Sequence, residues 1–383
     1  MKVAMLVAVL LLSSSTRLAG QNPVGYQQRD AENAAVKYLR ADASLRQSYP
    51  LAPDAAAMLR KLVESPLDGE DEKLVKAAGE ALDEFHHGAT SKRCDWAIST
   101  EDGALANTAH RGAIMELVYV SGLRARLRFR DGDVTGAMSD LLAGMAAARH
   151  LSTDGSLASV LFAYRLENAL SGILAQDLYR FSPAQLKELA SDLDALPSGS
   201  NLAMAFHEEK VLRHEMLDIG QEAKSRDDLI RLLLEKIPIL QSDKESANAI
   251  VDGCGSSIKG FLDCVEQQRS FNNVWDSRFS LPPEQFEATY KAELEKLSPK
   301  NPVIHQFTPN LPRFRWADAY CQTRRALMQT AIAIRLDGAN KLNQHPDPYN
   351  SKPFIYITLD NGFRLESRLT ENGVPLSLSI RTR

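Results

Sequence analysis

The chain has 383 residues, of which 44% are hydrophobic and 25% are charged. This composition is that of a folded globular protein and excludes a disordered, collagenous or rod-like chain. The 45 basic and 49 acidic side chains give a net charge of −4, which provides no electrostatic basis for binding nucleic acid or an anionic membrane surface. We therefore expect neither as a partner.

The first twenty residues have the three parts of a secretory signal peptide. Lys2 supplies a positive start, an apolar run covers 3–12, and small and polar residues follow as far as Gly20. The run is shorter than the roughly 20 apolar residues that a membrane span requires. Cleavage near Gly20 leaves 43 basic and 49 acidic side chains, a net charge of −6. We expect an exported protein, periplasmic or secreted, without a membrane span; the alternative is a buried N-terminal helix.

Apolar residues repeat at helical spacing over most of residues 21–345. Three successive stretches, which begin at Ile114, Met138 and Leu157, follow the pattern i, i+3, i+4, i+7. Each stretch makes one apolar stripe along a helix, and such a stripe packs against another helix. A glycine-containing turn follows each of the first two stretches. The sequence thus predicts a mainly α-helical domain built from antiparallel helical hairpins.

The stretch 123–137 resembles the middle of a tetratricopeptide hairpin. A small residue, an aromatic residue, Gly-Asp and then Ala recur at the offsets of that family; here they are Ala125, Phe129, Gly132, Asp133 and Ala137. The small residues are needed where two helices cross closely. No clean repeat of about 34 residues extends over the rest of the chain. The resemblance implies a tetratricopeptide-like array of helix pairs.

Four arginines in this stretch are candidate binding residues. They occupy every second position of the predicted helix and are Arg124, Arg126, Arg128 and Arg130. Together with Arg111 they form a basic strip that suits a carboxylate-bearing partner. The alternative is that they are solvated arginines whose aliphatic stems cover apolar surface.

Two groups of histidines are candidates for chemistry. His207, Glu208 and His214 are weak catalytic candidates. The two histidines start about 10 Å apart on a straight helix, too far to share one zinc ion, so we expect no metal there. The alternative is a charged helix face with Glu–Lys and Glu–Arg pairs.

The second group is the pair His86-His87, near Cys94 and Asp95, which could supply metal ligands. The alternative places both histidines at the C-terminal end of a helix over 71–87, where the helix dipole favours them.

Prolines interrupt the helical pattern between residues 253 and 312. We expect an irregular segment there, with a short helix over 283–297. Either this segment wraps over the helical body, or it forms a loop over a cleft, since long irregular segments often carry sites.

Export allows the four cysteines to form disulfides. A local bridge between Cys254 and Cys264 is the simplest pairing, and Cys94 with Cys321 is then a long-range bridge. Free thiols are the alternative. No two cysteines have the close spacing of a zinc site.

The tail, residues 346–383, differs in pattern from the rest. Alternating apolar segments over 354–380 are separated by Asn361-Gly362 and by Asn372-Gly373, the dipeptide typical of tight hairpins. The sequence predicts a three-stranded antiparallel meander.

Two resemblances involve this tail. Its residues 347–363, including Asp347-Pro348-Tyr349 and Lys352-Pro353-Phe354, are similar to the C-terminal segment of type II secretion pseudopilins. The same sequence motif occurs in a group of uncharacterised exported bacterial proteins, planctomycete-like in origin. That group is also similar to this chain around Cys94-Asp95-Trp96 and over 126–150. The group implies export and a helical body but no activity. The prepilin signal and its apolar helix are missing, so the tail implies no role in pilus assembly.

No set of residues identifies an enzyme. We expect a non-enzymatic protein of the cell envelope that binds a protein or peptide partner and needs no cofactor. The alternative is an envelope hydrolase whose site is assembled from distant residues, such as His207, Glu208 and His214 facing the 253–312 segment, because catalytic groups are defined by geometry and not by order in the chain.

Overall fold

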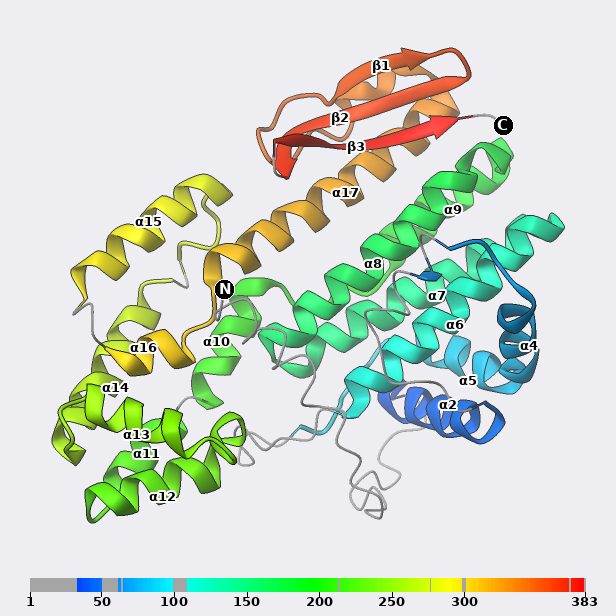
Figure 1. Cartoon of the computed structure of the whole chain (residues 1–383). Coiled ribbons are helices and arrows are strands. Elements are labelled where there is room, and N and C mark those ends of the chain that lie inside the picture. Colours follow the sequence, from blue (N-terminus) through cyan, green and yellow to red (C-terminus); the bar gives the residue numbers. More distant parts are fainter. Residues whose placement is uncertain are drawn as a thin grey trace.

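The computed structural model describes residues 33–49, 61–62, 65–98, 109–212, 214–275, 277–297, 301–371 and 373–381. The predicted signal peptide lies outside these residues. The described chain is mainly helical with a small C-terminal sheet, which confirms the predicted fold class (Figure 1). Among the described residues, no helix combines the length and apolar character that a membrane span needs.

The first half of the protein is a helical body. In chain order its helices are α2 (Ala34–Ser48), α4 (Gly69–Ala77), α5 (Gly79–Ala89), α6 (Ala109–Asp131), α7 (Val134–Leu151), α8 (Leu157–Asp177) and α9 (Pro183–Ala195). The helix predicted over 71–87 is therefore two helices, α4 and α5, which meet at Ala78.

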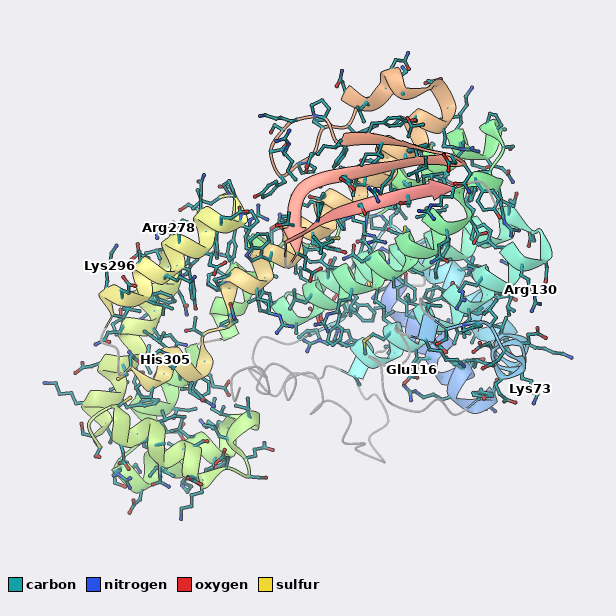
Figure 2. All side chains as sticks on the ribbon, turned by 45° about the horizontal axis from the view of Figure 1, so that its top comes forward. Lys73, Glu116, Arg130, Arg278, Lys296 and His305 are labelled. Atoms are coloured by element: carbon teal, nitrogen blue, oxygen red, sulfur yellow. The ribbon has the colours of Figure 1, made fainter. Side chains whose placement is uncertain are left out.

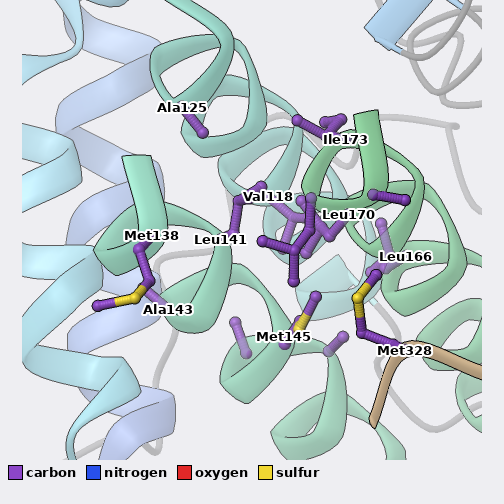
Figure 3. Packing of buried hydrophobic residues seen from close by; sticks show 14 of the residues in the cluster. Val118, Ala125, Met138, Leu141, Ala143, Met145, Leu166, Leu170, Ile173 and Met328 are labelled. Carbon is purple, nitrogen blue, oxygen red and sulfur yellow. The ribbon is translucent and has the colours of Figure 1, made fainter. Parts of the chain in front are cut away.

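Helices α6, α7 and α8 form successive hairpins around the largest apolar cluster, the central cluster. Ala125, Ala137 and Ala147 are fully buried, as expected for small residues at helix crossings. At Gly144 an added Cβ would lie 2.7 Å from a methyl carbon of Leu170, so the Leu170 side chain would have to shift to accommodate a larger residue. Figure 3 shows Leu141 and Leu170 among the buried residues of this cluster. The antiparallel hairpins are as predicted, and they are compatible with a tetratricopeptide-like array.

The second half continues with α10 (Leu202–Leu212), α11 (His214–Glu222), α12 (Arg226–Lys236), α13 (Lys244–Gly253), α14 (Ile258–Asn273), α15 (Pro283–Lys296), α16 (Pro302–Phe307) and α17 (Leu311–Asp337). Helices α11 to α14 and α16 enclose a separate apolar cluster, the distal cluster. Aromatic residues of α10, α14, α15 and α17 form a third, linking cluster with the start of α8.

The prediction of an irregular segment over 253–312 is wrong, because α14, α15 and α16 fill most of this range. Pro283, Pro302 and Pro312 lie in the first turns of α15, α16 and α17. Proline suits this position, since the first amides of a helix have no partner within the helix. These prolines start helices. The short helix predicted over 283–297 is confirmed as α15.

The C-terminal meander is also confirmed. Strands β1 (Ile355–Leu359), β2 (Gly362–Glu371) and β3 (Val374–Arg381) are antiparallel in the order β1-β2-β3. The buried face of the sheet lies on α17 and α8 (Figure 1). Its fully or nearly fully buried side chains are Phe363, Leu365, Leu369, Leu376, Leu378 and Ile380.

Candidate binding pocket

A pocket of about 510 Å³ opens where α5 meets the α6–α7 hairpin. The pocket is lined by seven residues with polar or charged side chains and one glycine: Asp83, His86, His87, Arg124, Arg128, Thr135, Gly136 and Ser139. Two of the four predicted binding arginines, Arg124 and Arg128, are therefore part of one site.

Beneath this lining lies Asp140, a carboxylate that is completely buried in the middle of α7. Arg124 Nη2 donates to its Oδ1 at 2.6 Å, and Arg124 Nε lies 3.0 and 3.1 Å from its two oxygens. Arg128 Nη1 donates to Oδ2 at 2.8 Å and to the Gly136 carbonyl at 2.9 Å. Arg124 and Arg128 reach the same carboxylate because residues four apart lie on one face of a helix. A Cβ at Gly136 would lie 3.0 Å from Arg128 Cδ and 2.1 Å from Asp133 Oδ2, so glycine leaves space for both side chains.

His86 completes this group, which we call the open cluster: Asp140, Arg124, Arg128 and His86. His86 Nε2 lies 2.8 Å from Asp140 Oδ1 and 3.0 Å from Arg124 Nη2. A guanidinium nitrogen can only donate, and a carboxylate oxygen can only accept. The shorter contact with the anion is satisfied when the proton is on Nε2, which leaves Nδ1 as the basic nitrogen of the neutral ring.

The other predicted arginines lie elsewhere, so the proposed basic strip is divided. Arg126 donates to the carbonyls of Leu62 and Ser65, both at 2.8 Å, and ties the chain before α4 to α6. Arg130 pairs with Glu72 at 2.6 Å and with Asp131 at 2.8 Å on the outer edge of the helical body (Figure 2). Neither belongs to the pocket lining.

Arg111 belongs to a second polar group, which we call the sealed cluster: Asp154, His110, Arg111, Ser156 and Ser159. His110 Nε2 lies 2.9 Å from Asp154 Oδ2, and Ser159 Oγ donates to the same oxygen. Arg111 donates to Ser159 Oγ at 2.8 Å and to Ser156 Oγ at 2.9 Å. Burial raises the pKa of Asp154, but the hydrogen bond from His110 and the Arg111 charge outweigh it and hold this pKa below its ordinary value.

Trp96 joins the sealed cluster to a buried histidine. The Trp96 ring stacks on His110 with centroids 4.7 Å apart, and its Nε1 donates to the His150 carbonyl at 2.8 Å. His150 Nδ1 is bonded to the Tyr38 hydroxyl at 2.9 Å, whereas its Nε2 is buried without a partner among the described residues. Burial lowers the pKa of His150 to about 4.

The structure describes the two predicted histidine groups only in part. His207 is exposed on α10, while the side chains of Glu208 and His214 lie outside the described residues. The metal-ligand alternative around His86 is not supported, because His86 faces Asp140 and Cys94 lies beside Asp154 and Thr153. Among the described residues, no group of three or more His, Cys, Asp or Glu side chains could hold a metal ion.

All four cysteines are free thiols in the structure, and no pair lies at disulfide distance. Cys94 packs against the central cluster, whereas Cys321 lies in the linking cluster, so the structure does not form the predicted long-range bridge. Cys254 and Cys264 both lie at the distal cluster. Burial and then the neighbouring Cys264 thiol raise the pKa of Cys254.

Sequence reasoning missed Asp140, the carboxylate buried beneath the pocket, as well as the lining residues Asp83, Thr135, Gly136 and Ser139. Asp140 is the one acidic residue of α7, a helix rich in apolar residues, and a lone acidic residue is rarely buried without a cationic partner. That position, one hairpin turn away from two arginines four apart, was the available signal.

Comparison with known proteins adds no assignment: no protein-family model, curated protein or solved structure matches the chain. The candidate site therefore rests on its geometry.

Proposed function

We propose that this protein is an exported, non-enzymatic helical protein of the cell envelope that binds a protein or peptide partner at the pocket between α5, α6 and α7. The observation that carries the proposal is the open cluster. Its two arginines are fixed in place by a buried carboxylate and line a solvent-accessible pocket. Binding groups that are held in position before the partner arrives lose less conformational entropy on binding.

A tagged chain, cross-linked mildly in its native envelope, tests this proposal. The wild type is compared with Arg128→Met and with Arg130→Met as the matched control. Both arginines are on α6, with side chains 33% and 49% exposed, but only Arg128 lines the pocket. We expect a stoichiometric partner with the wild type and Arg130→Met and its loss with Arg128→Met. A partner that remains with Arg128→Met, or recovery of the chain alone at adequate cross-linking yield, contradicts the proposal.

An envelope hydrolase is the second candidate, and one observation favours it. His86 and Asp140 form a histidine–carboxylate pair, and the exposed hydroxyl of Ser139 lines the same pocket. A histidine oriented by a carboxylate is the general base of many serine hydrolases. A serine-reactive fluorophosphonate probe that labels Ser139, with labelling abolished by His86→Gln, would establish this function over simple binding. Absence of labelling removes it.

Export would also place the cysteines in a compartment where disulfides can form. We propose that Cys254 and Cys264 form a bridge in an oxidising compartment, since Cys254 ends α13, Cys264 lies within α14 and both lie at the distal cluster. A loop this short stabilises a fold by about 2–3 kcal/mol in chain-entropy terms. Mass spectrometry of exported, unreduced protein should find the peptide pair joined, and reductant should lower the melting temperature. Intact bridges whose reduction leaves that temperature unchanged contradict the stabilising role.

A further inference from the structure

The arginines of the open cluster keep donors that Asp140 does not use. Arg124 binds Asp140 through Nε and Nη2, and Arg128 binds it through Nη1. Arg124 Nη1 and Arg128 Nη2 have no hydrogen-bond partner in the described part of the chain. Two guanidinium groups on adjacent helical turns therefore line the pocket with donors available for a ligand.

The charge within the open cluster is unbalanced. Two guanidinium charges face one carboxylate, which leaves an excess of one positive charge when His86 is neutral. Arg128 Nε also faces Asp133 at 3.5 Å, but both side chains of that pair are solvent-accessible, so the interaction is weak. A single carboxylate neutralises the excess of these four residues, which is already partly offset by the nearby carboxylates of Asp133 and Asp83. A phosphate dianion would bring a second negative charge next to Asp140 and the lining residue Asp83.

The size and remaining lining of the pocket restrict the ligand further. A volume of about 510 Å³ is far larger than one carboxylate and is in the range of pockets that enclose small organic ligands. Thr135 Oγ1 accepts a hydrogen bond from Gln185 at 3.0 Å, so its own proton is available to donate. Asp83 is exposed and is the one carboxylate among the lining residues. It repels an anion that enters the pocket.

We propose that the pocket binds a carboxylate group carried on a peptide segment of the partner, with Arg124 Nη1 and Arg128 Nη2 as its donors. This inference rests on the proposed function and specifies the chemistry that the partner presents. Asp140 is then a positioning residue, because it holds both guanidinium groups toward the pocket without touching the ligand. The carboxylate belongs either to a peptide C-terminus or to an acidic side chain.

Isothermal titration calorimetry with three short peptides tests this inference. The first is N-acetyl-trialanine with a free C-terminal carboxylate, the second is its carboxamide, and the third is N-acetyl-Ala-Glu-Ala-amide. We expect saturable binding of the first or the third at millimolar concentration and about tenfold weaker binding of the second, since losing a charge-assisted contact costs about that factor. The tighter of the two acids identifies the source of the carboxylate.

Three variants localise the binding. Arg128→Met should weaken the acid about tenfold, Arg130→Met should leave it unchanged, and Asp83→Asn should strengthen it a few-fold. The gain with Asp83→Asn cannot come from misfolding, which keeps the test valid if Arg128→Met is destabilised. Phenyl phosphate is titrated as a competing anion. The inference is overturned if acid and amide bind equally, if neither acid binds, if phenyl phosphate binds more tightly than the acids, or if Arg128→Met leaves the affinity unchanged. A cross-linked partner that depends on Arg128 would in that case still support the proposed function.

Discussion

The open and sealed clusters are built from the same chemical groups but differ in their access to solvent. Each has a buried aspartate that contacts a histidine. The aspartate also contacts one arginine in the sealed cluster and two arginines in the open cluster. In the open cluster the His86 side chain is 25% exposed, whereas His110 of the sealed cluster is 2% exposed and covered by Trp96. The comparison shows that residue type alone does not define a binding site. We expect the sealed cluster to stabilise the fold, whereas the open cluster also presents unused arginine donors to a pocket that a ligand can enter.

The largest expected effect that tests this comparison is Asp154→Asn. It leaves the buried His110 and the partly exposed Arg111 without their anion, and breaking a buried ion pair in this way costs about 3–5 kcal/mol. Urea unfolding measures the loss. The control is Asp131→Asn, an exposed carboxylate at the end of α6, which should change stability by less than about 0.5 kcal/mol. A loss of under about 1 kcal/mol for Asp154→Asn would show that the sealed cluster is hydrated.

The next effect is a pH dependence of the free energy of unfolding, which we assign to His150 next to the sealed cluster. Its pKa of about 4 lies below the ordinary value near 6.5, so the unfolded chain binds a proton that the folded chain does not. This stabilisation is complete above about pH 6.5 and falls by about 3 kcal/mol as the pH drops to about 4.

Unfolding measured from pH 7.5 to 4 checks this slope. The double variant His150→Phe with Tyr38→Phe removes the titrating group and leaves no unpaired hydroxyl. We expect a flatter pH profile for the double variant. The same slope in both proteins would refute the assignment to His150.

Asp140→Asn should cost less than Asp154→Asn. Arg128 and His86 are partly exposed, so water can replace the lost carboxylate, and we expect about 2 kcal/mol in the same urea measurement. The melting temperatures of the two variants give an independent ranking. A cost equal to that of Asp154→Asn would mean that both clusters have the same structural role.

The smallest effect concerns the Cys94 thiol, which lies beside Asp154. Burial raises the pKa of Cys94, so little thiolate forms and alkylation of the native protein should be slow. Asp154→Asn should increase the rate of iodoacetamide labelling at Cys94 several-fold by opening its surroundings, and Asp140→Asn should not. Peptide mass spectrometry measures the rate at this residue. Equal rates in the two variants would show that opening is not local to the sealed cluster.

Sequence patterns predicted the elements that depend on local spacing. The apolar repeats beginning at Ile114, Met138 and Leu157 became α6, α7 and α8, and the alternating segments of the tail became the meander, whose first turn is Asp360-Asn361 with Gly362 as the first residue of β2. Prolines misled the interpretation of 253–312, because a proline that ends one helical pattern also begins the next helix. Whether a proline ends one helix or begins the next depends on the residues before and after it.

The candidate site was only partly predictable. Arg124 and Arg128 were identified, but they were grouped with Arg126 and Arg130, although residues two apart on a helix point to different sides. His86 was grouped with Cys94, eight residues away, when its partner is Asp140, 54 residues away. Contacts of that range depend on how α5 packs on the α6–α7 hairpin, which no local spacing specifies.

The separation of the distal cluster from the central cluster has a consequence for how the molecule opens. The distal cluster is connected to the helical body through the linking cluster, in which Phe206, Trp275 and Phe314 pack together with the start of α8. Helices α11 to α14 can therefore lose their packing while α6, α7 and α8 keep theirs. Amide hydrogen exchange should divide the chain into two cooperative units, with earlier exchange in helices α11 to α14 and protection of the helices that hold the pocket.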